Sequence, residues 1–229
     1  PAPPRRASPR PPAAPALPTP EGLAGSFFGI NEALSVPSQL VFSGRVTGEQ
    51  QRAELEEDAR GVAALGAAMV RANSHTYPFF NHKSYARTAA ASQERSDRYF
   101  EVLGASGAEM LAVISPWPGI QTANHTDSYL PPDMDAYTRF VERIVERYDG
   151  DGESDAPGLV RGVTAWEIDN EPDLHNRVQP RGARRDIDPS TFQTPAEYAE
   201  VLRQTAAAIR RADPDAFILS AGMYNVRAP

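Results

Sequence analysis

The chain has 229 residues and a formal net charge of −7, with 41% hydrophobic and 23% charged residues. This length is sufficient for one ordered domain with a substantial core. The acidic balance argues against a nucleic-acid partner, because binding phosphates requires a clustered basic surface. The absence of cysteine excludes disulfides and thiolate metal sites, and no apolar run reaches the length of a membrane span.

Residues 1–22 consist mostly of Pro, Ala and Arg. Such a composition offers no apolar surface to bury, so we expect a disordered linker that makes few contacts with the rest of the chain. It is typical of a tether left behind a removed export signal, which predicts a secreted or cell-envelope protein. We expect the folded domain to comprise residues 23–229.

Within this domain, short apolar runs alternate with longer segments whose apolar residues recur at helical spacing. The sequence predicts strands over residues 26–32, 67–72, 109–115, 162–170 and 216–221. It predicts helices over residues 49–65, 93–103, 133–148 and 195–211.

This alternation indicates βαβ units and a parallel α/β sheet. Long segments follow the strands, whereas the returns from helix to strand are mostly short, as in a barrel whose working face is at the carboxyl ends of its strands. An open doubly wound sheet gives the same alternation, so the pattern alone leaves both architectures open. No GxGxxG or GxxxxGK[ST] follows a strand, which argues against nucleotide binding.

The most informative segment is TAWEIDNEPD, residues 164–173, where a strand pattern ends in polar residues. Pro172 disfavours helical geometry at Glu171, so the carboxylate is expected at the tip of the fourth strand. In a βα barrel that position faces the mouth of the barrel. One difficulty is geometric, because strict alternation along a strand would send Asn170 and Glu171 to opposite faces. Both can reach one pocket only if the strand ends or bulges there.

With its Trp166 and Asn170-Glu171-Pro172 on the fourth strand, the sequence resembles the clan of (β/α)₈ TIM-barrel glycoside hydrolases that includes families 5, 10 and 39. The resemblance implies that Glu171 is the general acid/base and that Asn170 hydrogen-bonds the sugar 2-hydroxyl. It also implies a nucleophilic Glu at the end of a seventh strand. Because the sequence predicts five strands, we expect about five βα units, the amino-terminal part of such a barrel, and no hydrolysis by this chain alone.

Further candidates for substrate binding follow the second and third strands. Arg71 matches the arginine that many of these enzymes use to hold the nucleophile, although a buried salt bridge would explain it equally. Trp117 could be a platform for a sugar ring or an anchor for its loop. Asn73, His75 and Tyr77 follow Arg71 and are expected to line the same mouth.

No cofactor is expected, and the sequence predicts no metal site. The segment DGDGESD, residues 149–155, has the alternating acids of a calcium loop but lacks its glycine at the sixth position and its glutamate at the twelfth. A solvated turn is the expected structure. The four histidines, His75, His82, His125 and His175, have no ligand spacing, which ranks a metal-dependent barrel hydrolase last.

The sequence therefore predicts a retaining glycoside hydrolase that acts on O-glycosidic bonds of an oligo- or polysaccharide, with no nucleic-acid partner and no membrane span. The alternative is a non-catalytic carbohydrate-binding or scaffold protein derived from such a barrel. The oligomeric state and the sugar are left open by the sequence.

Overall fold

A computed structural model describes residues 29–31, 47–72, 90–114, 116, 130–131, 133–170, 172 and 195–223 of the chain. The predicted linker at residues 1–22 lies outside the described residues. The expected start of the domain at residue 23 lies outside them as well.

The described strands form one parallel sheet in sequential order, β1-β2-β3-β4-β5, as the sequence predicted. The strands are β1 (Gly29–Asn31), β2 (Met69–Ala72), β3 (Glu109–Ile114), β4 (Ala165–Ile168) and β5 (Phe217–Ser220). This order has no switch point, which distinguishes it from the doubly wound sheet and agrees with part of a (β/α)₈ barrel. The predicted α/β barrel architecture is thereby confirmed for the described strands.

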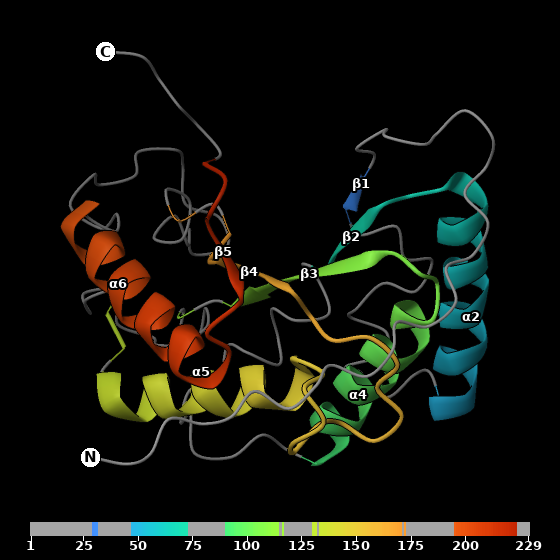
Figure 1. Cartoon of the computed structure of the whole chain (residues 1–229), viewed down its shortest axis with the longest axis horizontal. Helices are drawn as coiled ribbons and strands as arrows, with labels where there is room; N and C mark the ends of the chain where they lie inside the picture. The colour runs from blue at the N-terminus through green and yellow to red at the C-terminus, as the bar shows by residue number, and fades with distance from the viewer. Residues whose placement is uncertain are drawn as a thin grey trace, which may run out of the picture.

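Each pair of neighbouring strands from β2 onward is joined through a helix. The described helices are α2 (Gly48–Leu65), α4 (Ala90–Gly104), α5 (Met134–Tyr148) and α6 (Pro195–Ala212), at the four predicted positions. The sheet is curved, and these helices lie along its outer side (Figure 1). None of the described helices combines the length and apolar character that crossing a membrane would require.

Local sequence explains where the helices begin and end. Thr47 caps α2 in a capping box with Gln50, which satisfies two otherwise unpaired N–H groups. Gly66 ends the same helix in the left-handed conformation, with φ 64°. Asp133 caps α5 by accepting a hydrogen bond from the Ala136 N–H at 2.8 Å.

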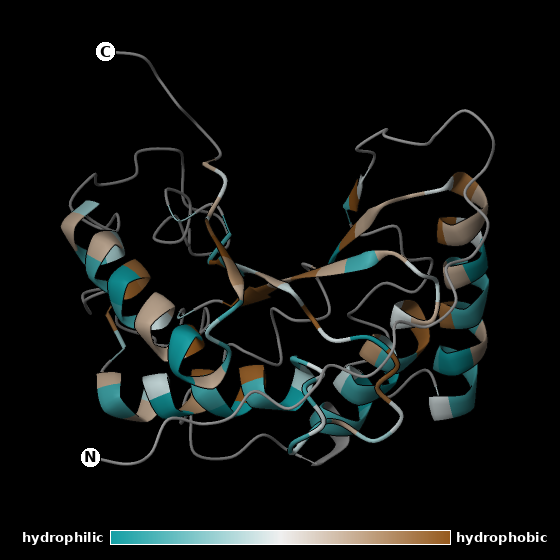
Figure 2. Ribbon diagram, viewed as in Figure 1, coloured by the Kyte–Doolittle hydropathy of each residue, from teal (hydrophilic) through white to brown (hydrophobic). Residues whose placement is uncertain are grey.

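The hydrophobic core lies between the outer face of the sheet and the helices. Strand residues are largely hydrophobic, whereas each helix carries both hydrophobic and hydrophilic residues (Figure 2). Because side chains alternate along a strand, every second residue faces this core. The strand residues of the core cluster are Val70, Ala72, Met110, Ala112, Ile114, Trp166 and Ile168.

The residues between them belong to the inner face of the sheet. On β3 and β4 this face carries Leu111, Val113 and Ala165, which are 7%, 0% and 3% exposed. The same alternation places Arg71 of β2 and Glu167 of β4 on it. The charged pair of Arg71 and Glu167 therefore lies on this face beside the buried apolar residues of β3.

Tyr198 of α6 connects the carboxyl ends of β4 and β5. Its hydroxyl donates to the Ile168 carbonyl at 3.1 Å and accepts from the Ala221 N–H at 2.7 Å. Burial is the main cause that raises the pKa of Tyr198 to about 12, so the hydroxyl keeps the proton that it donates. The carboxyl ends of β4 and β5 are thus hydrogen-bonded to one side chain of α6.

Replacing Tyr198 with Phe should lower the free energy of unfolding by about 1–3 kcal/mol, because two buried backbone groups lose their partner. Urea unfolding followed by circular dichroism measures this change. The exposed Val160, replaced with Ala, is the control and should change stability by less than about 0.5 kcal/mol. Equal effects of the two substitutions would contradict the structural role of the hydroxyl.

Candidate active site

The guanidinium of Arg71 is the centre of a hydrogen-bond network at the carboxyl edge of the sheet. Its Nε donates to Oε2 of Glu167 at 2.6 Å, and its Nη2 donates to Oε1 of Glu167 at 2.9 Å. The same Nη2 donates to Oδ1 of Asn170 at 2.9 Å, and Nη1 donates to Oδ1 of Asn31 at 3.0 Å. One side chain from β2 therefore holds residues from β1, β4 and the segment after β4.

Arg71 and Glu167 form a two-pronged ion pair that reaches across β3. Their side chains are 19% and 8% exposed, so the pair is only partly screened by water. Oε1 of Glu167 also lies 3.3 Å from the Gly222 N–H, which donates to it. The carboxylate thus accepts three N–H groups, which hold it in place.

Asp169 explains how Asn170 reaches the inner face. Strand β4 ends at Ile168, and Asp169 has a positive φ of 74°, which breaks the alternation of side chains. Strict alternation from the inward Glu167 would have sent Asn170 outward. The Asn170 N–H donates to Oδ1 of Asp169 at 2.8 Å, which supports the turn. The predicted strand over residues 162–170 is therefore too long at both ends, and its early termination is what brings Asn170 to Arg71.

Of the residues predicted for the site, the structure brings Arg71 and Asn170 together. The proposed acid/base, Glu171, lies outside the described residues, although it directly follows Asn170 in the sequence. The predicted substrate contacts Asn73, His75, Tyr77 and Trp117 also lie outside the described residues.

Two members of the network, Glu167 and Asn31, are additions to the site predicted from sequence. Glu167 is 6% exposed in a strand that is buried on both faces. A carboxylate in such a strand needs a cationic partner, and Arg71 is the cation on the same face of β2, on the other side of β3. This pairing of lone charges in apolar strands is the signal by which the sequence could have revealed Glu167.

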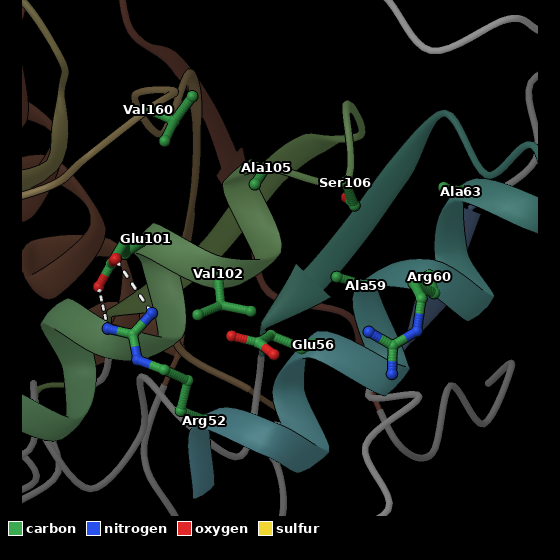
Figure 3. Close-up of a pocket in the computed structure, with 10 residues that line it drawn as sticks. All are labelled: Arg52, Glu56, Ala59, Arg60, Ala63, Glu101, Val102, Ala105, Ser106 and Val160. Atoms are coloured by element: carbon green, nitrogen blue, oxygen red, sulfur yellow. Dashed lines mark hydrogen bonds and ion pairs between the residues drawn. The ribbon is translucent and has the colours of Figure 1, made fainter. Parts of the chain in front are cut away.

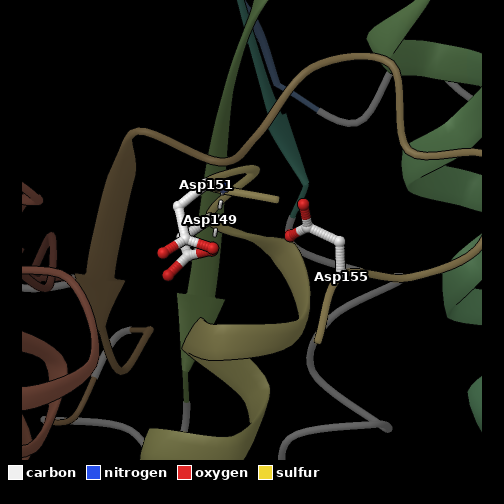
Figure 4. Close-up of side chains that lie close together, drawn as sticks. All are labelled: Asp149, Asp151 and Asp155. Carbon is white, nitrogen blue, oxygen red and sulfur yellow. Dashed lines mark hydrogen bonds between the residues drawn. The ribbon is translucent and has the colours of Figure 1, made fainter. Parts of the chain in front are cut away.

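The acidic loop after α5 lies apart from this network, in the connection that leads to the amino-terminal end of β4. Carboxylate oxygens of Asp149, Asp151 and Asp155 lie within 4.8 Å of one another (Figure 4). Both oxygens of Asp155 accept backbone N–H groups, from Gly150 at 3.1 Å and from Gly152 at 2.8 Å. The loop is thus closed by its own carboxylate, as in the predicted turn. Burial, followed by the charge of Asp151, raises the pKa of Asp149 to about 8.

A cavity of about 460 Å³ lies on the outer side of the molecule, between α2 and α4. The ion pair of Arg52 and Glu101 borders it, and Val102 forms part of its wall (Figure 3). None of the residues of the Arg71 network lines this cavity. It is therefore a groove between helices, separate from the candidate active site.

Comparison with known proteins shows the family of the chain. The model of glycoside hydrolase family 44 matches residues 62–227, which include β2, β4 and the whole Arg71 network except Asn31. No curated protein sequence matches the chain significantly.

Solved structures show the same fold at low sequence identity. An exo-β-1,4-mannosidase from Opitutaceae bacterium strain TAV5 has a TM-score of 0.55 and 18% identity, over 84% of this chain and 31% of its own. The GH5_18 protein of Streptomyces cattleya, solved with GlcNAc, has a TM-score of 0.54 and 17% identity, over 85% and 44%. A family 39 glycoside hydrolase from Bacteroides cellulosilyticus WH2 has a TM-score of 0.50 and 14% identity, over 86% and 32%. The chain spans less than half the length of each of these structures.

The backbone at Asp169 generates a prediction on stability. Asp169→Ala should lower the free energy of unfolding by about 1–3 kcal/mol, because alanine disfavours positive φ and leaves the Asn170 N–H without the acceptor. Asp169→Asn should lose less, since asparagine tolerates this conformation and keeps the oxygen. Chemical denaturation of both variants measures the difference. Equal losses would mean that neither φ nor the hydrogen bond determines the role of Asp169.

Asp149 generates a prediction on pH. Its folded-state pKa of about 8 lies above the ordinary value of 3.8, so the stability that the protonated group contributes is full below about pH 4 and is lost as pH rises through 8. The neutral variant Asp149→Asn should therefore gain stability relative to the parent protein as pH rises from 4 to 9. Melting temperatures across this range test the prediction, which a pH-independent difference would contradict.

Proposed function

Because the chain belongs to glycoside hydrolase family 44, we propose that it carries the acid/base part of a glycosidase active site, with Glu171 as the general acid/base. The observation that supports this proposal is the bond from Arg71 of β2 to Asn170, the residue before Glu171. This bond lies at the carboxyl edge of a parallel sheet, and that edge holds the active sites of (β/α) barrels.

The proposed reaction is hydrolysis with retention of configuration. One carboxylic acid protonates the leaving oxygen while a second carboxylate, about 5–5.5 Å away, attacks the anomeric carbon. Glu171 would give its proton to the glycosidic oxygen and, as a carboxylate, later take one from the water that releases the sugar. Glu167 is unsuited to the attacking role, because three N–H groups already occupy its oxygens.

The proposed substrate is an oligo- or polysaccharide. Since an arginine only donates hydrogen bonds, the amide oxygen of Asn170 must face Arg71, and its amide nitrogen is turned away from it. That nitrogen is the proposed donor to the sugar 2-hydroxyl. Trp117 is proposed as a platform for a sugar ring, with Asn73, His75 and Tyr77 along the same mouth. We propose a secreted or cell-envelope location, where polysaccharides too large to be imported are cut.

Replacing Glu171 with Gln should leave carbohydrate binding nearly intact, because the amide keeps the size and most hydrogen bonds of the carboxyl. It should lower kcat/KM about 10²–10⁴-fold for substrates with poor leaving groups, which need protonation. Activated aryl glycosides should lose less in the glycosylation step. The measurement is steady-state kinetics of the full-length protein on a panel of 4-nitrophenyl glycosides and unactivated oligosaccharides.

The matched control is Glu142→Gln, a glutamate of α5 that pairs with Arg211 on the outer side of the molecule. It should change neither class of substrate. Azide should partly restore turnover of activated substrates by Glu171→Ala, because this nucleophile needs no base. If Glu171→Gln reduced both classes of substrate equally, the acid/base assignment would be wrong. Binding without any hydrolysis by the parent protein would favour the non-catalytic carbohydrate-binding alternative.

A further inference from the structure

Glu167 has a position that the proposed reaction does not use. It lies on the inner face of β4, two residues before Asp169 and on the same face as Arg71. It is 6% exposed, and glutamate is rarely so buried unless it is paired. A buried carboxylate needs hydrogen-bond donors around it, and these donors show which groups Glu167 positions.

Within the described part of the chain, Glu167 accepts hydrogen bonds from one side chain and from one backbone N–H. Arg71 contributes Nε and Nη2, and Gly222, just after β5, contributes its N–H. The carboxylate therefore fixes both the position and the rotation of the guanidinium plane, because two parallel bonds define a plane where one would not. Without Glu167 the guanidinium would keep only single bonds to the amide oxygens of Asn31 and Asn170.

The orientation of the guanidinium determines the orientation of Asn170. Nη2 of Arg71 has two hydrogens, and the structure uses one for Glu167 and one for Asn170, at 2.9 Å each. Rotation of the plane would remove the second bond. The amide oxygen of Asn170 would then lose the contact that holds it toward Arg71.

We propose that Glu167 is a positioning residue of this active site, which fixes the amide of Asn170 through Arg71 so that its nitrogen faces the substrate. This inference rests on the proposed function, in which that nitrogen donates to the sugar 2-hydroxyl. Glu167 itself touches no reacting atom. Its removal should therefore matter only when a substrate offers the hydroxyl that Asn170 recognises.

Glu167→Gln is the test variant. The glutamine amide keeps the volume and one acceptor oxygen, but it replaces the other oxygen with an NH2 group that cannot accept a bond from Arg71. The substrates are the 4-nitrophenyl glycoside that the full-length protein hydrolyses fastest and the same glycoside without its 2-hydroxyl. On the first, kcat/KM should fall about 10–100-fold, mostly in kcat, since the 2-hydroxyl interaction strengthens in the transition state. On the 2-deoxy substrate it should fall less than about threefold.

Asn170→Ala should show the same dependence on substrate, and the double variant should lose little more than either single variant, because both act through one contact. Asp97→Asn is the matched control. It removes a two-pronged ion pair of similar exposure, with Arg147 and between α4 and α5, far from the inner face of the sheet. It should lower the melting temperature and leave the ratio between the two substrates unchanged.

The outcomes separate this inference from the proposed function. Equal losses of Glu167→Gln on both substrates, or no loss, would overturn the positioning role while leaving the glycosidase intact. Failure of the parent protein to hydrolyse any glycoside would overturn the proposed function instead. A crystal structure of Glu167→Gln decides the positioning role without activity: loss of the bond from Arg71 to Asn170 supports it, and an unchanged bond overturns it.

Discussion

The ion pair of Arg71 and Glu167 is the constraint on which the candidate active site depends. Both residues lie on the inner face of buried strands, beside Leu111 and Val113, where an unpaired charge would be strongly unfavourable. Each charge therefore requires the other, and the pair fixes the distance between the carboxyl ends of β2 and β4 across β3. Asn31 and Asn170 are held as consequences of this pairing, because they accept two of the three N–H groups of the guanidinium that Glu167 does not use.

The backbone after β4 departs from regular geometry at the point where the site is assembled. Asp169 adopts a positive φ, a conformation that costs a non-glycine residue about 1–2 kcal/mol. Its surroundings compensate: its N–H donates to the Ile114 carbonyl at 2.7 Å, and Tyr198 holds the preceding residue from α6. A regular continuation of β4 would be less strained and would place Asn170 among the helices. The strain is thus tied to the direction in which the site residues point.

Most of the fold could be predicted from the sequence because its signals are local. Apolar runs such as 109–115 and helical spacing such as 133–148 reflect burial on one side of each element, and the structure has β3 and α5 there. The pairing of Arg71 with Asn170 depends on a φ angle at Asp169, which no spacing of residues encodes. Glu167 was not among the site residues predicted from the sequence, because its contact with Arg71 exists only when β2 and β4 are placed on one sheet.

The charge balance of the network suits the proposed role of Glu171, which requires a protonated carboxyl group. An unpaired guanidinium near a carboxylic acid favours loss of its proton, and Glu171 is one peptide unit from Asn170, which contacts Arg71. The negative charge of Glu167 offsets the positive charge of Arg71, and the guanidinium can still donate to Asn170. Arg71 can therefore orient the amide of Asn170 while its own charge is offset by Glu167. A lysine could supply the positive charge, but it has no planar group and no nitrogen that donates to Glu167 and Asn170 in one fixed plane. The planar guanidinium is therefore what both the orientation of Asn170 and the charge balance require.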